Sequence, residues 1–357
     1  GGAIAGGSIA LQAGRDFRNE SLVVKDSWAT QQNSGSTTAL SNTASIVTTG
    51  ALSIDAGRDL TDLAGKLSAG SAVITAGNDI RFDTVKTGST YDSLISGYTE
   101  SNSSVTHQLS QLSIGGDLLM KAGGDLNLTG TQVAVGTGGK GSGIIAAGGA
   151  INIAAVKNEA NSSVMNDASS KAYDKQVHRN ETVVGAGVAA AGDLTVRAGI
   201  GGSADLNVTG STLAGGDNVA LSSTNNVNIA STTENHLSDV ATHRESSSTF
   251  KKSSATKADY SATTQAIGSS ISGNNVSIAA KNDITVGASE LTATDALALG
   301  ARLVCGGEQG SQDRLFAQPV QPRGLHDGRG AVCARAGGHT RQHHPGGGRG
   351  LLRIRAA

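Results

Sequence analysis

Three Gly-Gly-Asp triplets occur in this chain, at residues 115–117, 123–125 and 215–217. Aspartates in glycine-rich turns can bind calcium, because Ca²⁺ takes carboxylate and carbonyl oxygens as ligands. A calcium-binding β-roll needs the nonapeptide Gly-Gly-x-Gly-x-Asp in tandem, so that successive turns share each ion. The chain contains no such tandem. The sequence therefore predicts no calcium site.

Residues 136–141 read Gly-Thr-Gly-Gly-Lys-Gly, which satisfies the G-x-G-x-x-G pattern of dinucleotide-binding sites, and Glu159 follows about 20 residues on. Such a site places the phosphates at the N-terminus of a crossover helix. Residues 142–149 are too few and too rich in glycine to form that helix. We expect no dinucleotide cofactor here.

Cys305 and Cys333 are followed by His339, His343 and His344, and these residue types are zinc ligands. Structural zinc sites normally use closely spaced ligand pairs, and the two cysteines are much too far apart for a Cys-x2-Cys knuckle. We expect no zinc site and assign no metal-binding residue.

Some β-helical proteins hydrolyse or cleave polysaccharides, which requires clustered carboxylates or a Lys or Arg base on stacked strands. The aspartates of this chain instead follow glycines at turn positions, where a hydrogen bond to the backbone explains them. The sequence therefore predicts no enzyme, no catalytic residue and no cofactor. A polysaccharide hydrolase or lyase is the alternative function.

The composition limits both the core and the partners. The chain has 50 Gly but only 4 Phe, 4 Tyr, 1 Trp and 2 Met, so its core must be built from smaller side chains. A net charge of -1 provides no field that would recruit nucleic acid. No apolar run approaches the roughly 20 residues of a membrane-spanning segment. Because the chain begins within a repeat-like phrase and without Met, we expect it to be an internal piece of a longer protein.

One phrase recurs along the first 300 residues: an alternating apolar strand, a small residue with Gly, a polar residue with Asp, and a second apolar strand. Asp59 and Asp79 are 20 residues apart, Asp193 and Asp217 are 24 apart, and Asp117 and Asp125 are 8 apart. Spacings near 10 and 20 indicate a coil with more than one similar corner per turn. The pattern predicts an all-β parallel β-helix (β-solenoid) whose stability accumulates from contacts between neighbouring coils. Copies of the phrase occupy residues 52–60, 73–80, 118–128, 191–196, 213–221 and 276–286.

The same phrase predicts the chemistry of the corners. Glycine permits a positive φ there, and Asn or Asp hydrogen-bonds to the local backbone. Pro is absent from residues 1–300, as we expect if every strand is paired along both edges. Amide ladders between coils are predicted for four asparagines: Asn207, Asn225, Asn226 and Asn228.

Three polar stretches interrupt the coils, at residues 86–108, 157–182 and 231–265. They are rich in Ser, Thr, Asn and charged residues, and two of them carry His178, His236 and His243. We expect surface excursions from the solenoid, such as hairpins projecting sideways. The alternative is that they make contacts with a receptor or glycan.

The composition changes near residue 300. All 12 Lys precede it, whereas residues 301–357 hold 9 Arg, both Cys and all 3 Pro. One interpretation of this Arg/Gly/His-rich tail is a frameshift in a GC-rich gene. The other is a natural basic tail, disordered and able to bind polyanions or metal.

The repeats resemble the haemagglutinin-repeat region of filamentous haemagglutinins and of the related contact-dependent growth inhibition toxins and haemolysins. The resemblance covers roughly residues 1–300, and the stretch at 231–265 is similar to the spacers between such repeats. It rests on three phrases: Ala-Gly-Asn-Asp-Ile at 76–80, Gly-Asp-Leu-Asn-Leu at 124–128, and residues 268–289, which end in Ala-Ala-Lys-Asn-Asp-Ile-Thr-Val-Gly-Ala-Ser.

The resemblance implies a right-handed β-helix that is secreted to the bacterial cell surface through an outer-membrane partner transporter. It implies a structural shaft of a surface adhesin or toxin-delivery protein, which binds a receptor or glycan on host or neighbouring cells. The family's N-terminal secretion domain and a toxin domain are not recognisable in this chain.

Overall fold

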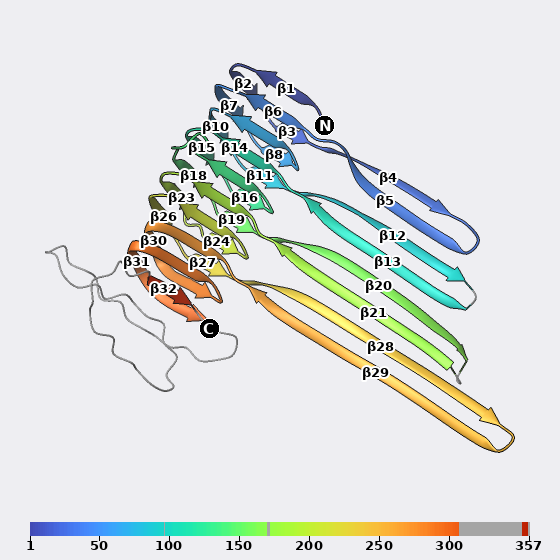
Figure 1. The fold of residues 1–357 in the computed structure, drawn as a ribbon. Coiled ribbons are helices and arrows are strands. Elements are labelled where there is room, and N and C mark those ends of the chain that lie inside the picture. Colours follow the sequence, from blue (N-terminus) through green and yellow to red (C-terminus); the bar gives the residue numbers. More distant parts are fainter. Residues whose placement is uncertain (96, 170–171, 307–351, 356–357) are drawn as a thin grey trace, which may run out of the picture.

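The computed structural model describes residues 1–95, 97–169, 172–306 and 352–355. Strands make up nearly all of its regular structure, and the described residues contain no helix. The strands form two sheets, one of 24 strands and one of eight. Figure 1 shows the larger sheet wound into a right-handed parallel β-helix and the smaller one projecting from its side.

Each coil of the solenoid has three sides, and the strands on each side pair in parallel with those of the next coil. Seven coils consist of three separate strands, whereas β30 (Ser270–Gly287) and β31 (Glu290–Gly306) each run around a whole coil. The first side consists of β1 (Ala3–Gly6), β6 (Ser45–Thr48), β9 (Lys66–Ala69), β14 (Gln111–Ile114), β17 (Gln132–Val135), β22 (Gly187–Ala190) and β25 (Thr212–Gly215).

The other two sides follow the same order along the chain. The second consists of β2 (Ile9–Ala13), β7 (Ala51–Ala56), β10 (Ser71–Ala76), β15 (Leu118–Ala122), β18 (Gly143–Ala147), β23 (Leu194–Ala198) and β26 (Asn218–Ser223). The third consists of β3 (Phe17–Glu20), β8 (Leu60–Leu63), β11 (Ile80–Asp83), β16 (Leu126–Thr129), β19 (Ile151–Ala154), β24 (Leu206–Thr209) and β27 (Val227–Ala230). β32 (Leu352–Arg355) pairs antiparallel with β31.

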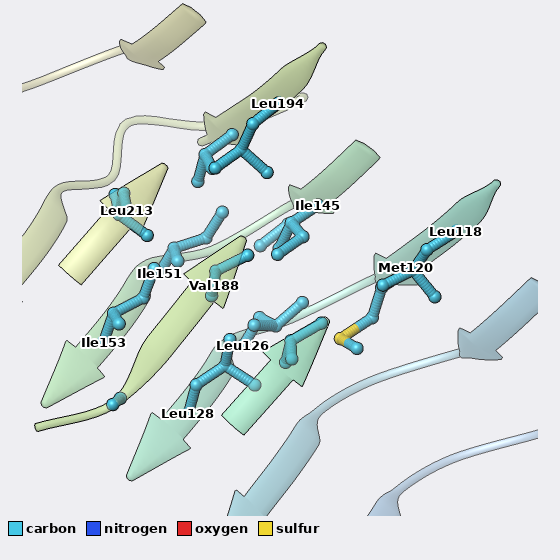
Figure 2. Packing of buried hydrophobic residues seen from close by; sticks show 14 of the residues in the cluster. Leu118, Met120, Leu126, Leu128, Ile145, Ile151, Ile153, Val188, Leu194 and Leu213 are labelled. Atoms are coloured by element: carbon cyan, nitrogen blue, oxygen red, sulfur yellow. The ribbon is translucent and has the colours of Figure 1, made fainter. Parts of the chain in front are cut away.

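The core is a set of columns of small aliphatic side chains running along the axis. Along the second side, Ile54 pairs in register with Ile74, Ile74 with Met120, and Met120 with Ile145, and all four are buried. Figure 2 shows the side chains of several coils, among them Leu118, Leu126, Ile151 and Leu194, converging on the narrow interior. Alternating inward and outward positions produce this arrangement, because successive side chains of a strand point to opposite faces.

Four hairpins leave the solenoid at the corner between its third and first sides, and together they form the eight-stranded antiparallel sheet, here the hairpin sheet. The polar stretches 86–108 and 157–182 lie within two of them, and the stretch 231–265 lies within a third except for residue 231. The fourth hairpin, at residues 22–42, was missed by the sequence analysis. The hairpins are β4 (Leu22–Ala29) with β5 (Asn33–Asn42), β12 (Val85–Ile95) with β13 (Tyr98–Gln108), β20 (Val156–Ser169) with β21 (Ala172–Val184), and β28 (Thr232–Ser248) with β29 (Lys251–Ile267).

The hairpins follow the first, third, fifth and seventh coils, so one hairpin occurs for every two coils. The spacing of the hairpins matches the rise of the coils. Strands pair at about 4.8 Å both in the solenoid and in the hairpins, so two coils rise by the same distance that the two strands of one hairpin occupy. Neighbouring hairpins therefore meet edge to edge and form a continuous sheet.

The corners differ from the sequence prediction in how they use glycine. Gly57, Gly77 and Gly123 do not have a positive φ. They are needed because coils approach closely: a Cβ on Gly77 would lie 2.3 Å from the carbonyl oxygen of Gly57, and one on Gly123 would lie 2.2 Å from that of Gly77.

Apart from two longer corners, where Gly136, Gly139, Gly199 and Gly201 have the predicted positive φ, positive φ in the coils occurs at the third-to-first corner of those that carry no hairpin. The residues there are Ala64 (φ 51°), Gly130 (56°), Gly210 (56°) and Ala288 (43°). A single left-handed residue thus replaces a whole hairpin at that corner.

Candidate binding surface

The corner aspartates hydrogen-bond to the neighbouring coil rather than to their own turn. Oδ1 of Asp117 accepts from the backbone N–H of Ser142 at 2.8 Å, and Oδ1 of Asp125 accepts from that of Ala150 at 2.7 Å. Oδ1 of Asp79 in turn accepts from the backbone N–H of Asp125 at 2.8 Å. These carboxylates therefore satisfy backbone donors from coil to coil, which accounts for the recurrent Asp without a bound ion.

Two of the predicted asparagines, Asn207 and Asn228, form an amide ladder, as the sequence analysis proposed. Asn228 donates to Asn207 and Asn207 to Asn152, each at 2.8 Å. The ladder extends to Asn127, which accepts from Asn152 at 2.8 Å. The other two predicted residues also contact the next coil: Asn225 accepts from Asn282 at 2.5 Å, and Asn226 accepts from the backbone N–H of Asp283 at 3.2 Å.

The G-x-G-x-x-G segment at residues 136–141 is a corner of the fifth coil. It connects β17 to β18, so a strand follows it where a dinucleotide site would need a helix. Its backbone N–H groups are used within the solenoid: Gly136 donates to Gly116 at 3.1 Å and Gly138 to Gly115 at 2.9 Å. Glu159 lies in β20 of the hairpin sheet.

Of the candidate zinc ligands, the side chain of Cys305 and all of Cys333, His339, His343 and His344 lie outside the described residues, as does most of the tail at 301–357. Within the described part of the chain, no group of three His, Cys, Asp or Glu residues is placed to hold a metal ion. The same residues contain no helix of the length and apolarity needed to cross a bilayer.

Residues directly opposite each other in antiparallel strands project from the same face, so the registers define the two faces of the hairpin sheet. One row of residues crosses all eight strands. It begins at the single Trp and continues mainly through polar residues, and we call the face on which it lies the aromatic face. Its members are Trp28, Gly35, Tyr91, Asn102, Ser162, His178, Ser238 and Ser261.

Trp28 and Tyr91 meet above Gly35 on the aromatic face. Their ring centroids are 6.2 Å apart, and Trp28 is 48% exposed. A Cβ on Gly35 would lie 2.9 Å from Cζ2 of the indole and 2.9 Å from the backbone oxygen of Thr90, so a side chain at this position would displace the indole or the neighbouring strand. An exposed Trp packed on a half-buried Tyr, beside amides and hydroxyls, suits stacking on, and hydrogen bonding to, a ligand with both apolar and polar faces.

The opposite side, the groove face, contains a groove of about 670 Å³ across β13, β20, β21, β28 and β29. Ser103, Asn161 and Arg179 line its middle row, and Glu181 and Asn235 line the next. Glu181 accepts from Lys157 and from Asn235, each at 2.9 Å, and the hydrogen bond from Lys157 is the main cause of its lowered pKa. The groove therefore presents ionised and neutral hydrogen-bonding groups together.

The histidines noted in the sequence lie on this sheet but not in one cluster. His178 and His236 lie on the aromatic face, where His236 Nδ1 is 3.3 Å from Asn180 Oδ1. His243 lies on the groove face, stacked on Tyr173 with centroids 5.5 Å apart, and its Nδ1 is 2.7 Å from Thr256 Oγ1. His107 also lies on the groove face, and burial, followed by the charge of Lys86, lowers its pKa.

Sequence reasoning missed a buried carboxyl group in the solenoid. Asp62 occupies an inward position on the third side and is 1% exposed. It accepts hydrogen bonds from Asn19 Nδ2 at 2.6 Å, Ser110 Oγ at 2.5 Å and the backbone N–H of Gly65 at 3.0 Å. Burial raises its pKa, although these bonds act in the opposite direction. The signal was the sequence Leu60-Thr-Asp-Leu, which places Asp where the repeat requires an apolar residue.

The described residues thus form a parallel solenoid with a two-faced hairpin sheet, the architecture of a structural repeat protein. A family model described as "Hemagglutinin repeat" matches the chain at residues 3–97, 95–171 and 167–257. The chain belongs to the haemagglutinin-repeat family, which confirms the resemblance proposed from its sequence. Neither the curated proteins nor the solved structures that were compared gave a match.

Proposed function

We propose that this chain is a segment of the shaft of a secreted surface adhesin, in which the solenoid holds the hairpin sheet away from the cell. The observation that carries the proposal is the spacing of one hairpin per two coils, which produces a continuous projecting sheet with two largely polar faces. Nine coils at about 4.8 Å each make a rod of about 40 Å. Haemagglutinin-repeat membership supports the same role.

The proposal includes delivery to the bacterial surface through an outer-membrane partner transporter, which the resemblance to filamentous haemagglutinins implies. Contacts with a receptor or glycan on host or neighbouring cells would use the hairpin sheet. A role in holding a contact-dependent toxin at a distance is consistent with the same shaft. Such a toxin would be a separate domain of the longer protein.

The test is binding of the purified chain to cells and to immobilised glycans. We expect binding that falls when residues 231–265 are replaced by the short corner found at residues 63–65. The matched control replaces Ile151 with Val, which alters the solenoid interior and leaves the hairpin sheet intact. Equal binding by all three proteins would place adhesion elsewhere. Depolymerisation of a polysaccharide by the native chain would favour the alternative, a β-helical hydrolase or lyase.

A further inference from the structure

The last strand of the hairpin sheet has one edge without a partner in the described structure. β29 is 17 residues long and pairs only with β28. Every residue from Lys251 to Ala266 is exposed. The sequence prediction that all strands are paired along both edges is therefore wrong for β29, and for β4 at the other edge of this sheet. A long open edge presents N–H and C=O groups that can pair with another strand.

The solenoid restricts what can pair there. β28 and β29 stand level with the seventh and eighth coils, and the ninth coil, β31, extends one strand spacing further. A second copy stacked head to tail through its β4 would need its own first coil at the position that β31 occupies. A copy related by a two-fold axis normal to the sheet runs in the opposite direction, so its solenoid lies at the far end of β29.

The charges and the length of β29 together select one register for that two-fold arrangement. A two-fold axis normal to the sheet leaves the groove faces of both copies on one side of the sheet and the aromatic faces on the other. The axis must therefore pass between one residue of β29 and the identical residue of the second copy. Centred on Asp259 or on Lys257, it would bring like charges together. Centred on Ala255, it would pair Lys251 with Asp259, but only the nine residues 251–259 of each strand would pair. Centred on Ala258, it pairs Lys257 with Asp259 of the second copy twice, places Lys251 and Lys252 opposite uncharged Gln265 and Thr264, and pairs the fifteen residues 251–265.

Two further observations favour this contact. Among the described residues, neither Lys257 nor Asp259 belongs to an ion pair within the chain. The two most exposed large hydrophobic residues of the described chain, Phe250 (98%) and Tyr260 (69%), lie on this hairpin. In the same register Tyr260 lies opposite Thr256 of the second copy, which would cover part of the ring.

We propose that β29 pairs antiparallel with β29 of a second copy of this chain, with the two-fold axis at Ala258. The two hairpin sheets then form one continuous sheet of sixteen strands between two antiparallel solenoids. Each groove face and each aromatic face continues across the dimer. The association is isologous and closed, so it produces a dimer and no fibre.

Sedimentation equilibrium of the full chain tests the proposal. We expect a species of twice 35.5 kDa. Lys257→Asp places like charges opposite each other at two positions, and we expect it to raise the dissociation constant at least about tenfold. The double variant Lys257→Asp, Asp259→Lys restores opposite charges with their positions exchanged, and should return the constant to within about threefold of the native value. A native chain that stays monomeric at about 100 μM would overturn the proposal, as would a dimer that both variants leave unchanged.

Disulfide trapping tests the position of the axis. In a background of Cys305→Ser and Cys333→Ser, Ala258→Cys should give a covalent dimer on mild oxidation, because identical residues on the axis face each other across the new pair. The control is Ala241→Cys, which pairs with Ala258 one strand in from the edge. Equal cross-linking of both variants, or none with Ala258→Cys, would contradict the proposed register.

Discussion

At the corners, the backbones of neighbouring coils approach too closely for a side chain to fit between them, which explains why glycine recurs there. Gly14, Gly57, Gly77, Gly123 and Gly148 occupy equivalent corners of five successive coils. In the last four, a Cβ would lie 2.1–2.3 Å from the carbonyl oxygen of the preceding glycine. Gly14 is in the first coil and has nothing within 4 Å of that position. Replacing glycine should therefore destabilise the fold less in the first coil, at the end of the rod, than in the coils that follow.

We predict that Gly123→Ala lowers the free energy of unfolding by about 2–3 kcal/mol, because the clash is with backbone that cannot rotate away. Gly14→Ala is the matched control and should change it by less than about 0.5 kcal/mol. Thermal and denaturant unfolding followed by far-ultraviolet circular dichroism measures both. Equal effects at the two positions would show that contact between coils does not determine the requirement for glycine.

Asp62 makes stability depend on pH. Its folded-state pKa is raised by burial, so the folded protein binds this proton more tightly than the unfolded chain. The contribution of this group to stability is fully present below the ordinary pKa of 3.8 and is lost as the pH rises through the raised value. We predict that Asp62→Asn removes this part of the pH dependence, so that the stability of the variant relative to the native chain increases across that interval.

Asp62→Ala is the companion variant. It leaves the side-chain amide of Asn19 and the backbone N–H of Gly65 without their acceptor in a buried site, and we expect a loss of about 2–3 kcal/mol at neutral pH. Unfolding by urea at several pH values measures both variants. A native chain whose stability falls in parallel with that of Asp62→Asn would show that Asp62 contributes no pH dependence.

At the scale of the elements, the contact between the first two hairpins depends on a small residue beneath a large one, Gly35 beneath Trp28. Gly35→Ala would push the indole of Trp28 away from Tyr91, since the added Cβ lies 2.9 Å from the ring. We predict loss of the near-ultraviolet circular dichroism of the Trp28–Tyr91 pair, with a local destabilisation of about 1 kcal/mol. The far-ultraviolet signal of the solenoid should not change. Gly7→Ala is the control, because its Cβ would have no neighbour within 4 Å.

The coil strands could be predicted from sequence, whereas the joining of the hairpins into one sheet could not. Alternation at Leu52, Ile54 and Ile74 directly encodes an inward face with a period of two. The hairpin at residues 22–42 was missed because β4 begins Leu-Val-Val and reads like another coil strand. The signal that indicates it is the distance of 43 residues from Asp16 to Asp59, about twice one coil. The surfaces on the hairpin sheet depend on registers between hairpins far apart in sequence, and no local pattern specifies those.

At the scale of the whole molecule, the repeating unit is two coils and one hairpin, not one coil. In the solenoid, each coil contacts only its neighbours, so stability accumulates along the axis. The hairpin sheet adds a second constraint, because neighbouring hairpins must also be two strand spacings apart. The two sheets agree only when coils and hairpins are added in the ratio of two to one. An insertion or deletion that preserves the strand spacing in only one of the two sheets disrupts the other.

Two deletions distinguish these requirements. Removing residues 45–110 takes out two coils and one hairpin, joins Ala44 to Gln111, and brings β5 beside β20 at the normal spacing. Removing residues 111–131 takes out a single coil and leaves the hairpins β12–β13 and β20–β21 offset by only one coil rise, although each hairpin occupies two strand spacings. We predict that the larger deletion retains the hydrogen-exchange protection of both sheets, whereas the smaller one loses protection in the hairpins. If the 21-residue deletion instead leaves the hairpins as protected as the 66-residue deletion does, the hairpin sheet does not constrain the solenoid, and each coil is an independent repeat.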